Sequence, residues 1–325
     1  MIIVHVETTA DGVSEVSLEA VTFARTLAAA GGGVPVDALV VGTLADGVDE
    51  TLAAYGVRTV HHAGGPDFEL FSGAATATAV LAAREASPTV VLMSGGTNRG
   101  NEVMARVAAR LGVAMAANVV SFQGLSPFVV TRQVVGGAAL EEVRLGQRPA
   151  VFTVAGHAVE AEPAAERGAG TVTALDVTPS AADLAVRVVA VEAEDHGAAD
   201  NLSSARVVVG AGRGAGGPDG FKDVIELADL LGGTLGVSRV VTSLGWRPHH
   251  EQVGQTGSRI APEVYIPCGI SGAIQHWAGC ASSKVIVAIN TDAEAPMMTK
   301  ATYAVVGDMH EVVPAINEEL RQRKG

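Results

Sequence analysis

Short apolar runs alternate with helical stripes over the first 111 residues, and this order leaves few folds open to the chain. Each run has the length of a buried strand, and each stripe repeats apolar side chains with the period of a helix. Runs lie at residues 2–6, 38–41, 57–60 and 90–93, and stripes at residues 18–28, 51–55, 68–86 and 98–111. This order predicts an α/β fold, in which helices cover a parallel sheet. Because hydrophobic residues make up 48% of the chain and aromatic residues only 4%, we expect cores of Ala, Val, Leu and Ile.

The pattern of apolar residues changes toward the end of this first domain. Alternating apolar and polar residues at 119–154 predict a hairpin on the sheet edge, and residues 186–191 predict a last strand. The segment 192–201 is acidic and carries no large apolar side chain, which is typical of a linker between domains. We therefore predict an N-terminal α/β domain over residues 1–191, a linker over 192–203 and a second domain over 204–325, with relative motion of the two domains.

Three features that could suggest a ligand are interpreted without one. The glycine-rich segment 94–100 resembles the loops of ATP pyrophosphatases, but it follows a late strand, so we interpret it as a strand-to-helix turn. Cys268 and Cys280 form neither a C-x-x-C motif nor a zinc pattern and are expected to be small buried side chains. Two pairs of adjacent histidines, at 61–62 and 249–250, lack an accompanying carboxylate or cysteine cluster, so we predict no metal site.

Charge and hydropathy exclude other classes of protein. The formal net charge is −13, from 22 basic and 35 acidic residues, which argues against a nucleic-acid-binding surface. The chain has no uninterrupted apolar run of about 20 residues and no signal-peptide pattern at its start. We therefore expect a cytoplasmic protein that does not insert into membranes.

The second half opens with a glycine-rich turn at residues 210–217, between a predicted strand and a predicted helix at 221–231. This arrangement is typical of a pyrophosphate on a helix N-terminus, and Arg213 adds a cation suited to a phosphate. Nicotinamide-binding proteins also need an acidic residue at the end of the next strand, which we predict at 239–243. That strand ends without an acid, and Asp229 falls inside the helix. The pattern therefore favours a dinucleotide bound in another way.

The stretch 254–290 has the layout of a ligand site. A predicted strand at 264–266 leads into a turn of small residues at 269–273, and a helix with Gln275 and His276 follows. Glycines allow close approach of the backbone to a ligand, and the N–H groups of a helix start suit an anion. A second strand ends at Asn290, and open α/β sheets bind ligands at such carboxyl ends.

The same stretch resembles the α subunit of electron-transfer flavoproteins. The likeness is carried by Val-Gly-Gln-Thr-Gly at 253–257, Gly-Ile-Ser-Gly-Ala-Ile-Gln-His at 269–276, Gly279, and Val-Ala-Ile-Asn at 287–290. It extends from Arg206 to about residue 314, and more loosely over the whole chain. The resemblance implies an N-terminal parallel-sheet domain that is similar to nucleotide-binding folds but has no ligand of its own, and a C-terminal doubly wound FAD-binding domain.

The resemblance also implies roles for individual residues. It places Arg239 over the flavin ring, His276 at the C2 carbonyl and Thr256 at N5. The guanidinium is a permanent cation, the imidazole can donate a hydrogen bond, and the hydroxyl can donate or accept, so it suits both redox states of the flavin. Asn290 and Asp308 are expected to hold the ribose and adenine. The other implied FAD-binding residues are Arg213, Ser238, Gln252, Gln255, Gly257, Ser271, Gly272, Ala273 and Gln275. Tyr265 and Trp277 are expected in core or rim packing, and no catalytic residue is predicted.

As a family member, the chain is expected to be the FAD-carrying subunit of a heterodimer with a β subunit. The resemblance implies electrons from flavin dehydrogenases, such as the acyl-CoA dehydrogenases of fatty acid oxidation, and delivery to a quinone oxidoreductase of the respiratory chain. Such a carrier breaks no substrate bond and is not an enzyme. The alternatives are a nicotinamide-dependent dehydrogenase subunit and a ligand-free scaffold or nucleotide-sensing module. The sequence leaves three questions open: which dehydrogenase is the donor, whether electron transfer is simple or bifurcating, and whether the partner binds AMP or a second FAD.

Overall fold

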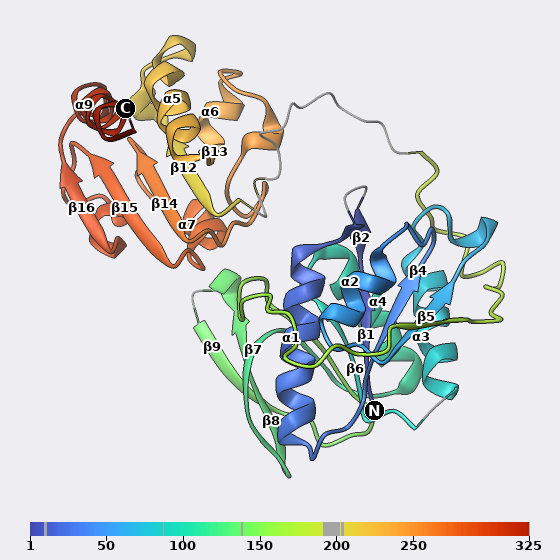
Figure 1. Cartoon of the computed structure of the whole chain (residues 1–325). Helices are drawn as coiled ribbons and strands as arrows, with labels where there is room; N and C mark the ends of the chain where they lie inside the picture. The colour runs from blue at the N-terminus through green and yellow to red at the C-terminus, as the bar shows by residue number, and fades with distance from the viewer. Residues whose placement is uncertain (10–11, 87, 138, 191–201, 203–204, 325) are drawn as a thin grey trace. The chain divides into compact units, whose positions relative to one another are not determined.

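The computed structural model describes residues 1–9, 12–86, 88–137, 139–190, 202 and 205–324 (Figure 1). The chain divides into one unit of Met1–Val134 and Leu140–Ala193 and another of Val135–Ala139 and Glu194–Gly325. Each unit has its own sheet, and parallel strands dominate both, which confirms the predicted α/β fold. Apart from Leu202, the predicted linker lies outside the described residues, so its bounds and the motion expected of it stay predictions.

The N-terminal unit contains a nine-stranded sheet in the order β11-β5-β4-β1-β6-β10-β7-β8-β9. A separate two-stranded sheet pairs β2 with β3. The strands are β1 (Ile2–Val6), β2 (Thr8–Thr9), β3 (Gly12–Val13), β4 (Val36–Val41), β5 (Thr59–Ala63), β6 (Val91–Gly95), β7 (Met115–Leu125), β8 (Phe128–Val134), β9 (Ala139–Arg144), β10 (Ala150–Val154) and β11 (Thr171–Ala174). The helices are α1 (Glu15–Ala30), α2 (Val48–Ala54), α3 (Gly73–Glu85) and α4 (Asn98–Leu111), with a short 3₁₀ turn η1 (Pro66–Phe68). The 3₁₀ turn η2 (Val135–Gly137), between β8 and β9, is counted with the other unit.

Side chains that alternate along β1 divide the core of this unit into two layers. Ile2 and Val4 pack in a cluster with residues of α1 and α2, whereas Ile3 packs with residues of α3 and α4. Helices therefore cover both faces of the sheet, as Figure 1 shows. Such strands, which are buried on both faces, read as continuous apolar runs rather than alternating ones, and this is why the sequence predicts them well.

The region 119–154 is only partly the predicted edge hairpin. β7 and β8 pair antiparallel, and β9 forms the sheet edge. β10, however, returns to the sheet interior, where it pairs parallel with both β6 and β7. All five of its residues are buried, which fits a strand covered on both faces rather than a hairpin arm.

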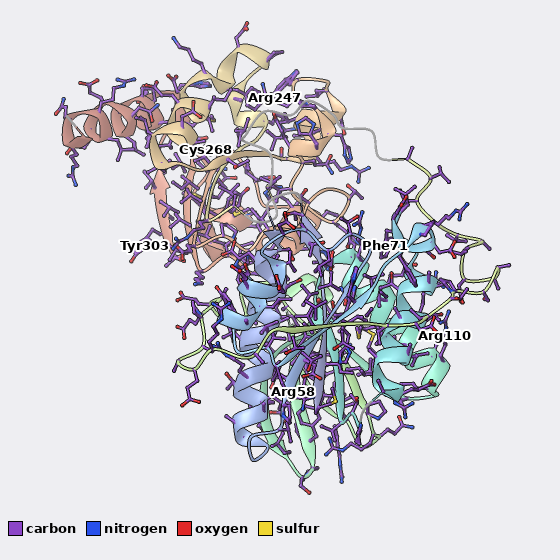
Figure 2. All side chains as sticks on the ribbon, turned by 45° about the vertical axis from the view of Figure 1, so that its right-hand side comes forward. Arg58, Phe71, Arg110, Arg247, Cys268 and Tyr303 are labelled. Atoms are coloured by element: carbon purple, nitrogen blue, oxygen red, sulfur yellow. The ribbon has the colours of Figure 1, made fainter. Side chains whose placement is uncertain are left out.

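The predicted strand at 186–191 is wrong for its described residues, 186–190, which form no strand. The last strand of this unit is β11, which pairs with β5 at the other sheet edge. Val186 is 72% exposed, so its side chain finds no core that would stabilise a further strand. The segment packs instead beside α3, where the Val188 N–H donates to the Phe71 carbonyl at 2.8 Å. Arg110 of α4, labelled in Figure 2, binds Asp183 just upstream at 2.6 Å.

The glycine-rich turn 94–100 has a packing role in the structure. A Cβ at Gly100 would lie 2.1 Å from the Gly95 carbonyl oxygen, so only glycine fits. Thr97 caps α4 by accepting from the Gly100 N–H at 2.8 Å, and its hydroxyl donates to the carboxylate of Glu7. Burial raises the pKa of Glu7, while contacts with Thr97, Arg99 and Gly100 oppose the shift. The chain's own carboxylate therefore lies at the start of α4, where a bound anion would otherwise be favoured.

The C-terminal unit contains a parallel five-stranded sheet in the order β13-β12-β14-β15-β16. Its strands are β12 (Val207–Ala211), β13 (Thr234–Val237), β14 (Val264–Cys268), β15 (Val285–Asn290) and β16 (Tyr303–Val306). Its helices are α5 (Lys222–Leu231), α6 (Arg239–Ser243), α7 (Ile274–Cys280), α8 (Pro296–Lys300) and α9 (Met309–Lys324), with 3₁₀ turns η3 (Arg213–Ala215), η4 (Pro218–Phe221) and η5 (His249–Glu251). This is a doubly wound order, and its direction reverses between β12 and β14, where such folds bind ligands.

Residues 239–243, predicted as a strand, form helix α6 instead. The strand that precedes them is β13, whose register with β12 ends where Ala211 faces Val237. One further bond, from the Ser238 N–H to the Ala211 carbonyl at 3.1 Å, closes this ladder. The chain then turns into α6, which buries Val241 in the core, so packing overrides the strand propensity of Val-Val-Thr.

Candidate functional site

A cavity of about 600 Å³ lies at the carboxyl edge of the C-terminal sheet. Segments that follow all five strands contribute to its wall, which is the expected position for a ligand in a doubly wound fold. Its lining comprises Arg213, Gly214, Ser238, Arg239, Val240, Gln252, Val253, Gly254, Gln255, Thr256, Gly269, Ile270, Ser271, Gly272, Ala273, Gln275, His276, Asn290, Thr291, Asp292, Ala295, Gly307, Asp308, Met309 and His310.

Every FAD-binding residue implied by the resemblance lines this cavity except Gly257. Gly257 supports the wall instead, because a Cβ there would lie 2.2 Å from the Gln252 carbonyl oxygen. The sequence interpretation missed several lining residues, among them Gly214, Asp292 and His310. Gly214 lies in the glycine-rich turn at 210–217, whereas the signal for Asp292 and His310 is only their position beyond a strand, which does not separate a ligand contact from an ordinary loop residue.

The glycine-rich turn after β12 does not offer its amides to a pyrophosphate in the way the sequence pattern suggests. The Gly212 N–H donates to the Cys268 carbonyl at 3.0 Å, and the Gly214 N–H donates to the Gly269 carbonyl at 3.1 Å. A Cβ at Gly212 would lie 2.4 Å from the Gly269 oxygen, so these glycines let two loops pack together. Helix α5 begins only at Lys222, after two 3₁₀ turns, so its start does not directly follow the glycine-rich turn.

Two arginines supply positive charge to the wall, which also holds the carboxylates of Asp292 and Asp308. Arg213 and Arg239 are both exposed and both line it. Within the described ranges, neither guanidinium forms an ion pair. A guanidinium stays charged at any relevant pH and binds phosphate or another anion through a fixed fork of donors. The wall therefore holds two cations available to an anionic ligand.

A chain of hydrogen bonds orients Thr256 at this wall. The Thr242 hydroxyl donates to Gln252 Oε1 at 2.6 Å, and Gln252 Nε2 donates to Thr256 Oγ1 at 3.0 Å. Gln252 is only 2% exposed, so its amide is held in place. Because a hydroxyl has two lone pairs and one proton, Thr256 keeps its proton and one lone pair for a ligand.

His276 is the most buried titratable side chain of the wall, with 6% of its surface exposed. Burial lowers the pKa of His276 to about 4, an effect that a backbone interaction with Val253 opposes, so the imidazole is neutral near pH 7. Its Nε2 lies 2.7 Å from the Tyr265 hydroxyl oxygen. Tyr265 is fully buried, as the core assignment predicts, but it also contacts a residue of the cavity.

Two buried polar atoms of the wall lack partners among the described residues, namely Ser238 Oγ and His276 Nδ1. Buried polar groups are nearly always hydrogen-bonded, so unsatisfied ones at a cavity indicate a missing ligand or water. Together with the two arginines, they fit a ligand that has both anionic groups and hydrogen-bonding edges, such as a flavin dinucleotide.

The polar side chains at the ends of β15 and β16 are largely hydrogen-bonded within the chain. Asn290 Nδ2 donates to the Ile270 carbonyl at 3.1 Å, and its Oδ1 accepts from the Asp292 N–H at 3.1 Å. Asp308 Oδ1 accepts from the His310 N–H at 2.9 Å. The carboxylate of Asp308 keeps acceptor capacity for a ligand hydroxyl, whereas Asn290 mainly ties the loops after β14 and β15 together.

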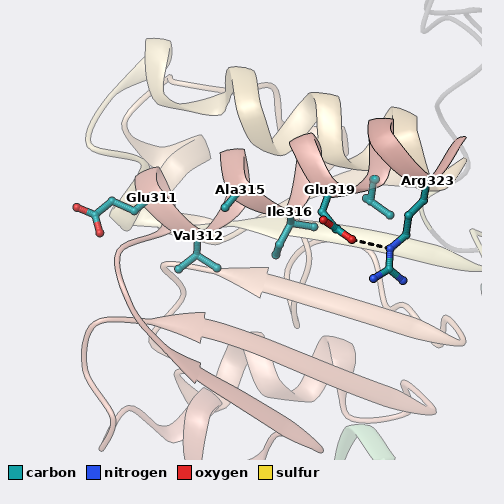
Figure 3. A pocket seen from close by; sticks show the side chains of 7 residues that line it. Glu311, Val312, Ala315, Ile316, Glu319 and Arg323 are labelled. Atoms are coloured by element: carbon teal, nitrogen blue, oxygen red, sulfur yellow. Dashed lines mark hydrogen bonds and ion pairs between the residues drawn. The ribbon is translucent and has the colours of Figure 1, made fainter. Parts of the chain in front are cut away.

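A second hollow, of about 570 Å³, runs along α9 (Figure 3). It is lined by apolar and charged side chains of this one helix, of which Glu319 accepts from Arg323 at 2.8 Å. A single helix lines this hollow, whereas segments after five strands converge on the cavity at the sheet edge, so that cavity is the candidate site. Within the part of the chain that the structure describes, no cluster of metal-ligating side chains occurs, and no helix is long and apolar enough to cross a membrane.

Two family models match the chain. The electron transfer flavoprotein domain matches residues 2–180, and the electron transfer flavoprotein FAD-binding domain matches residues 201–281. The electron transfer flavoprotein subunit alpha of Mycobacterium tuberculosis is 40% identical over 329 aligned positions, which cover 100% of this chain and 99% of that protein.

Further relatives carry the same name. The electron transfer flavoprotein subunit alpha of Mycobacterium leprae is 38% identical over 99% of both chains. That of Thermoanaerobacterium thermosaccharolyticum is 34% identical over 90% of this chain and 89% of its own length. With the cavity in the domain that matches an FAD-binding family, the chain belongs to the α subunits of electron-transfer flavoproteins, and its cofactor is FAD.

Proposed function

We propose that the cavity of the C-terminal unit holds the FAD of a heterodimeric electron carrier. In this role the chain accepts electrons from flavin dehydrogenases, such as those acting on acyl-CoA, and passes them to a quinone oxidoreductase of the respiratory chain. The observation that carries the proposal is the set of unpaired groups in one cavity, Arg213, Arg239, Ser238 Oγ and His276 Nδ1. They offer cations and buried hydrogen-bonding atoms together.

Arg239, Thr256 and His276 are the residues proposed to meet the redox-active ring. Bound FAD supplies one- and two-electron chemistry. The guanidinium of Arg239 keeps its charge and favours added negative charge nearby. The Thr256 hydroxyl has a free proton and a free lone pair, because Gln252 occupies only one acceptor position, so it can serve either redox state. His276 presents a neutral imidazole.

Arg213 and the small residues after β14 are proposed to hold the pyrophosphate. Ser271 and Gly272 line the wall there, and Gly272 has a φ of +80°, which favours glycine. A Cβ at Gly272 would also lie 2.5 Å from the Met297 nitrogen, so the turn stays tight. Asp308 is proposed at the ribose and adenine end of the cavity.

The structure favours this function over a nicotinamide-dependent dehydrogenase. A nicotinamide site needs free amides in the first glycine-rich turn and an acid at the end of the next strand. Here the amides of Gly212 and Gly214 are bonded to the chain itself. The residue that follows β13 is Ser238 rather than an acid.

The α-subunit membership implies a β subunit as partner in a heterodimer. We propose that this partner completes the flavin site, because exposed apolar side chains flank the cavity. Val240 of the lining is 36% exposed, and Ile274, the first residue of α7 and a neighbour of the lining residues Ala273 and Gln275, is 79% exposed. Exposed apolar groups beside a cofactor site are typical of a surface that a partner covers.

The test is co-expression of the chain with its β subunit, followed by visible spectroscopy and electron-transfer assays. We expect flavin absorbance from the heterodimer, reduction of the flavin by an acyl-CoA dehydrogenase with its substrate, and reoxidation by the quinone oxidoreductase. Arg213→Ala should weaken FAD retention, whereas Arg323→Ala, on α9 outside the cavity, should not. A colourless heterodimer that binds reduced nicotinamide would overturn the proposal.

A further inference from the structure

The pair of Tyr265 and His276 joins a core strand to the wall of the cavity. Tyr265 lies on β14 with none of its surface exposed, and its hydroxyl oxygen is 2.7 Å from His276 Nε2 on α7. The two rings lie 26° from parallel, with centroids 6.1 Å apart. The hydroxyl therefore reaches the edge of the imidazole that carries Nε2.

The backbone of β12 makes room for this contact. Gly210 lies on the strand next to β14, and a Cβ there would be 2.6 Å from the Tyr265 hydroxyl oxygen. Any larger residue would displace the hydroxyl, so the glycine leaves the space in which the tyrosine ring and its hydroxyl pack.

The protons of the pair allow two arrangements. A neutral imidazole has one N–H and one free lone pair, and a tyrosine hydroxyl has one proton to donate. If Nε2 carried the imidazole proton, the Tyr265 proton would point elsewhere. His276 is the one hydrogen-bond partner of Tyr265 among the described residues, so that proton would be buried and unpaired. Nδ1 would also be a buried acceptor without a donor.

The other arrangement leaves fewer groups unsatisfied. The Tyr265 hydroxyl donates to Nε2, and the imidazole proton lies on Nδ1. There it faces the backbone of Val253, which favours an N–H at that position, and it can also donate to a ligand. Burial raises the pKa of Tyr265 well above its ordinary value, so the hydroxyl keeps its proton, and burial keeps His276 neutral. Only Nδ1–H then lacks a full hydrogen bond, because its interaction with the backbone of Val253 falls short of one.

We infer that Tyr265 is a positioning residue, which keeps the proton of the neutral His276 on Nδ1 and its ring fixed at the cavity wall. The fixed proton sets the polarity that the imidazole presents to the ligand. The claim about the tautomer concerns the protein alone. The claim about the flavin potential rests on the proposed function. Through His276, Tyr265 helps to set the reduction potential of the bound flavin.

The first experiment measures the tautomer in the heterodimer after FAD has been removed. Histidine labelled with ¹⁵N distinguishes a protonated Nδ1 from a protonated Nε2, and His276→Gln identifies the signal of this residue. We expect Nδ1–H almost exclusively in the wild type and a mixture with Nε2–H in Tyr265→Phe. Tyr303→Phe, on the exposed strand β16 (Figure 2), is the control and should match the wild type. An unchanged tautomer in Tyr265→Phe would overturn the inference, whether or not FAD is the ligand.

The second experiment measures the potential of the FAD-loaded heterodimer. In Tyr265→Phe we expect the preference for reduced over oxidised flavin to fall about tenfold, which is about 59 mV for a one-electron couple. Gly210→Ala retains the hydroxyl but displaces it, so its potential should shift in the same direction. If both variants keep the wild-type potential while the tautomer changes, the link from Tyr265 to the flavin is wrong. A heterodimer that binds no flavin at all would instead contradict the proposed function.

Discussion

Gly279 on helix α7 is a position where one added methyl group should disturb the flavin site. A Cβ there would lie 2.4 Å from Gly254 Cα and 2.5 Å from Gly254 N. Carbon atoms prefer separations of about 3.5–4.0 Å. Gly279→Ala must therefore move the loop at 253–257 away from α7 by about 1 Å. That loop carries Thr256 into the cavity.

The cost follows from the contacts that this movement strains. The loop is tied to α7 by bonds from the Gln255 N–H to the Gln275 carbonyl at 2.8 Å and from the Ile260 N–H to the Gly279 carbonyl at 2.7 Å. Each such bond contributes about 1 kcal/mol, and overpacking costs about 1–3 kcal/mol. The better helix propensity of alanine returns at most about 1 kcal/mol. We expect the free energy of unfolding to fall by about 2–4 kcal/mol.

Urea denaturation of the FAD-loaded heterodimer, followed by flavin fluorescence as the cofactor leaves, measures this change. Gly217→Ala is the matched control, because a Cβ there meets nothing within 4 Å and its φ of 170° suits any residue. We expect the control to lie within about 0.5 kcal/mol of the wild type. If Gly279→Ala unfolds and releases FAD at the same urea concentration as Gly217→Ala, the close packing of the loop on α7 is refuted.

Three further predictions address charge, assembly and pH. Arg239→Ala should lower the flavin potential by the equivalent of about 1–3 kcal/mol, the contribution of a charged hydrogen-bonding group; an unchanged potential in a variant that still binds FAD would contradict its assignment. The chain without its β subunit should lose FAD during gel filtration, and Ile274→Asp should weaken assembly of the heterodimer; tight stoichiometric FAD on the isolated chain would count against a shared site. Burial lowers the pKa of His5 to about 4, below its ordinary 6.5, so the unfolded chain binds a proton that the folded chain does not. The free energy of unfolding should therefore fall by about 3 kcal/mol as the pH drops from 6.5 to 4, and denaturation curves of His5→Asn should lack that part of the loss.

Much of the fold can be read from the sequence because its central strands are buried on both faces. Continuous apolar runs marked β1 and β6 well, and the stripe at 98–111 has the same bounds as helix α4. The errors fall where tertiary packing decides between structures of similar local propensity. Residues 239–243 have strand-forming side chains, yet they form a helix, because the pairing of β13 with β12 ends at Val237, just before them.

The candidate site was predictable in its residue types but not in its internal bonding. A family signature indicates which positions gather around a cofactor, and the structure brings all of them except Gly257 to one cavity. The contact between Tyr265 and His276 depends on how α7 lies on β14, and sequence spacing does not fix that arrangement. Likewise, only packed coordinates show that the amides of the turn after β12 are already bonded within the chain.

A crystal structure of the heterodimer with FAD bound would show directly whether this cavity is the flavin site. We expect FAD in the cavity at the carboxyl edge of the C-terminal sheet, with the flavin ring beside Arg239, Thr256 and His276 and the pyrophosphate beside Arg213. FAD bound outside this cavity, or in it with the adenine rather than the flavin at Arg239 and Thr256, would refute this assignment.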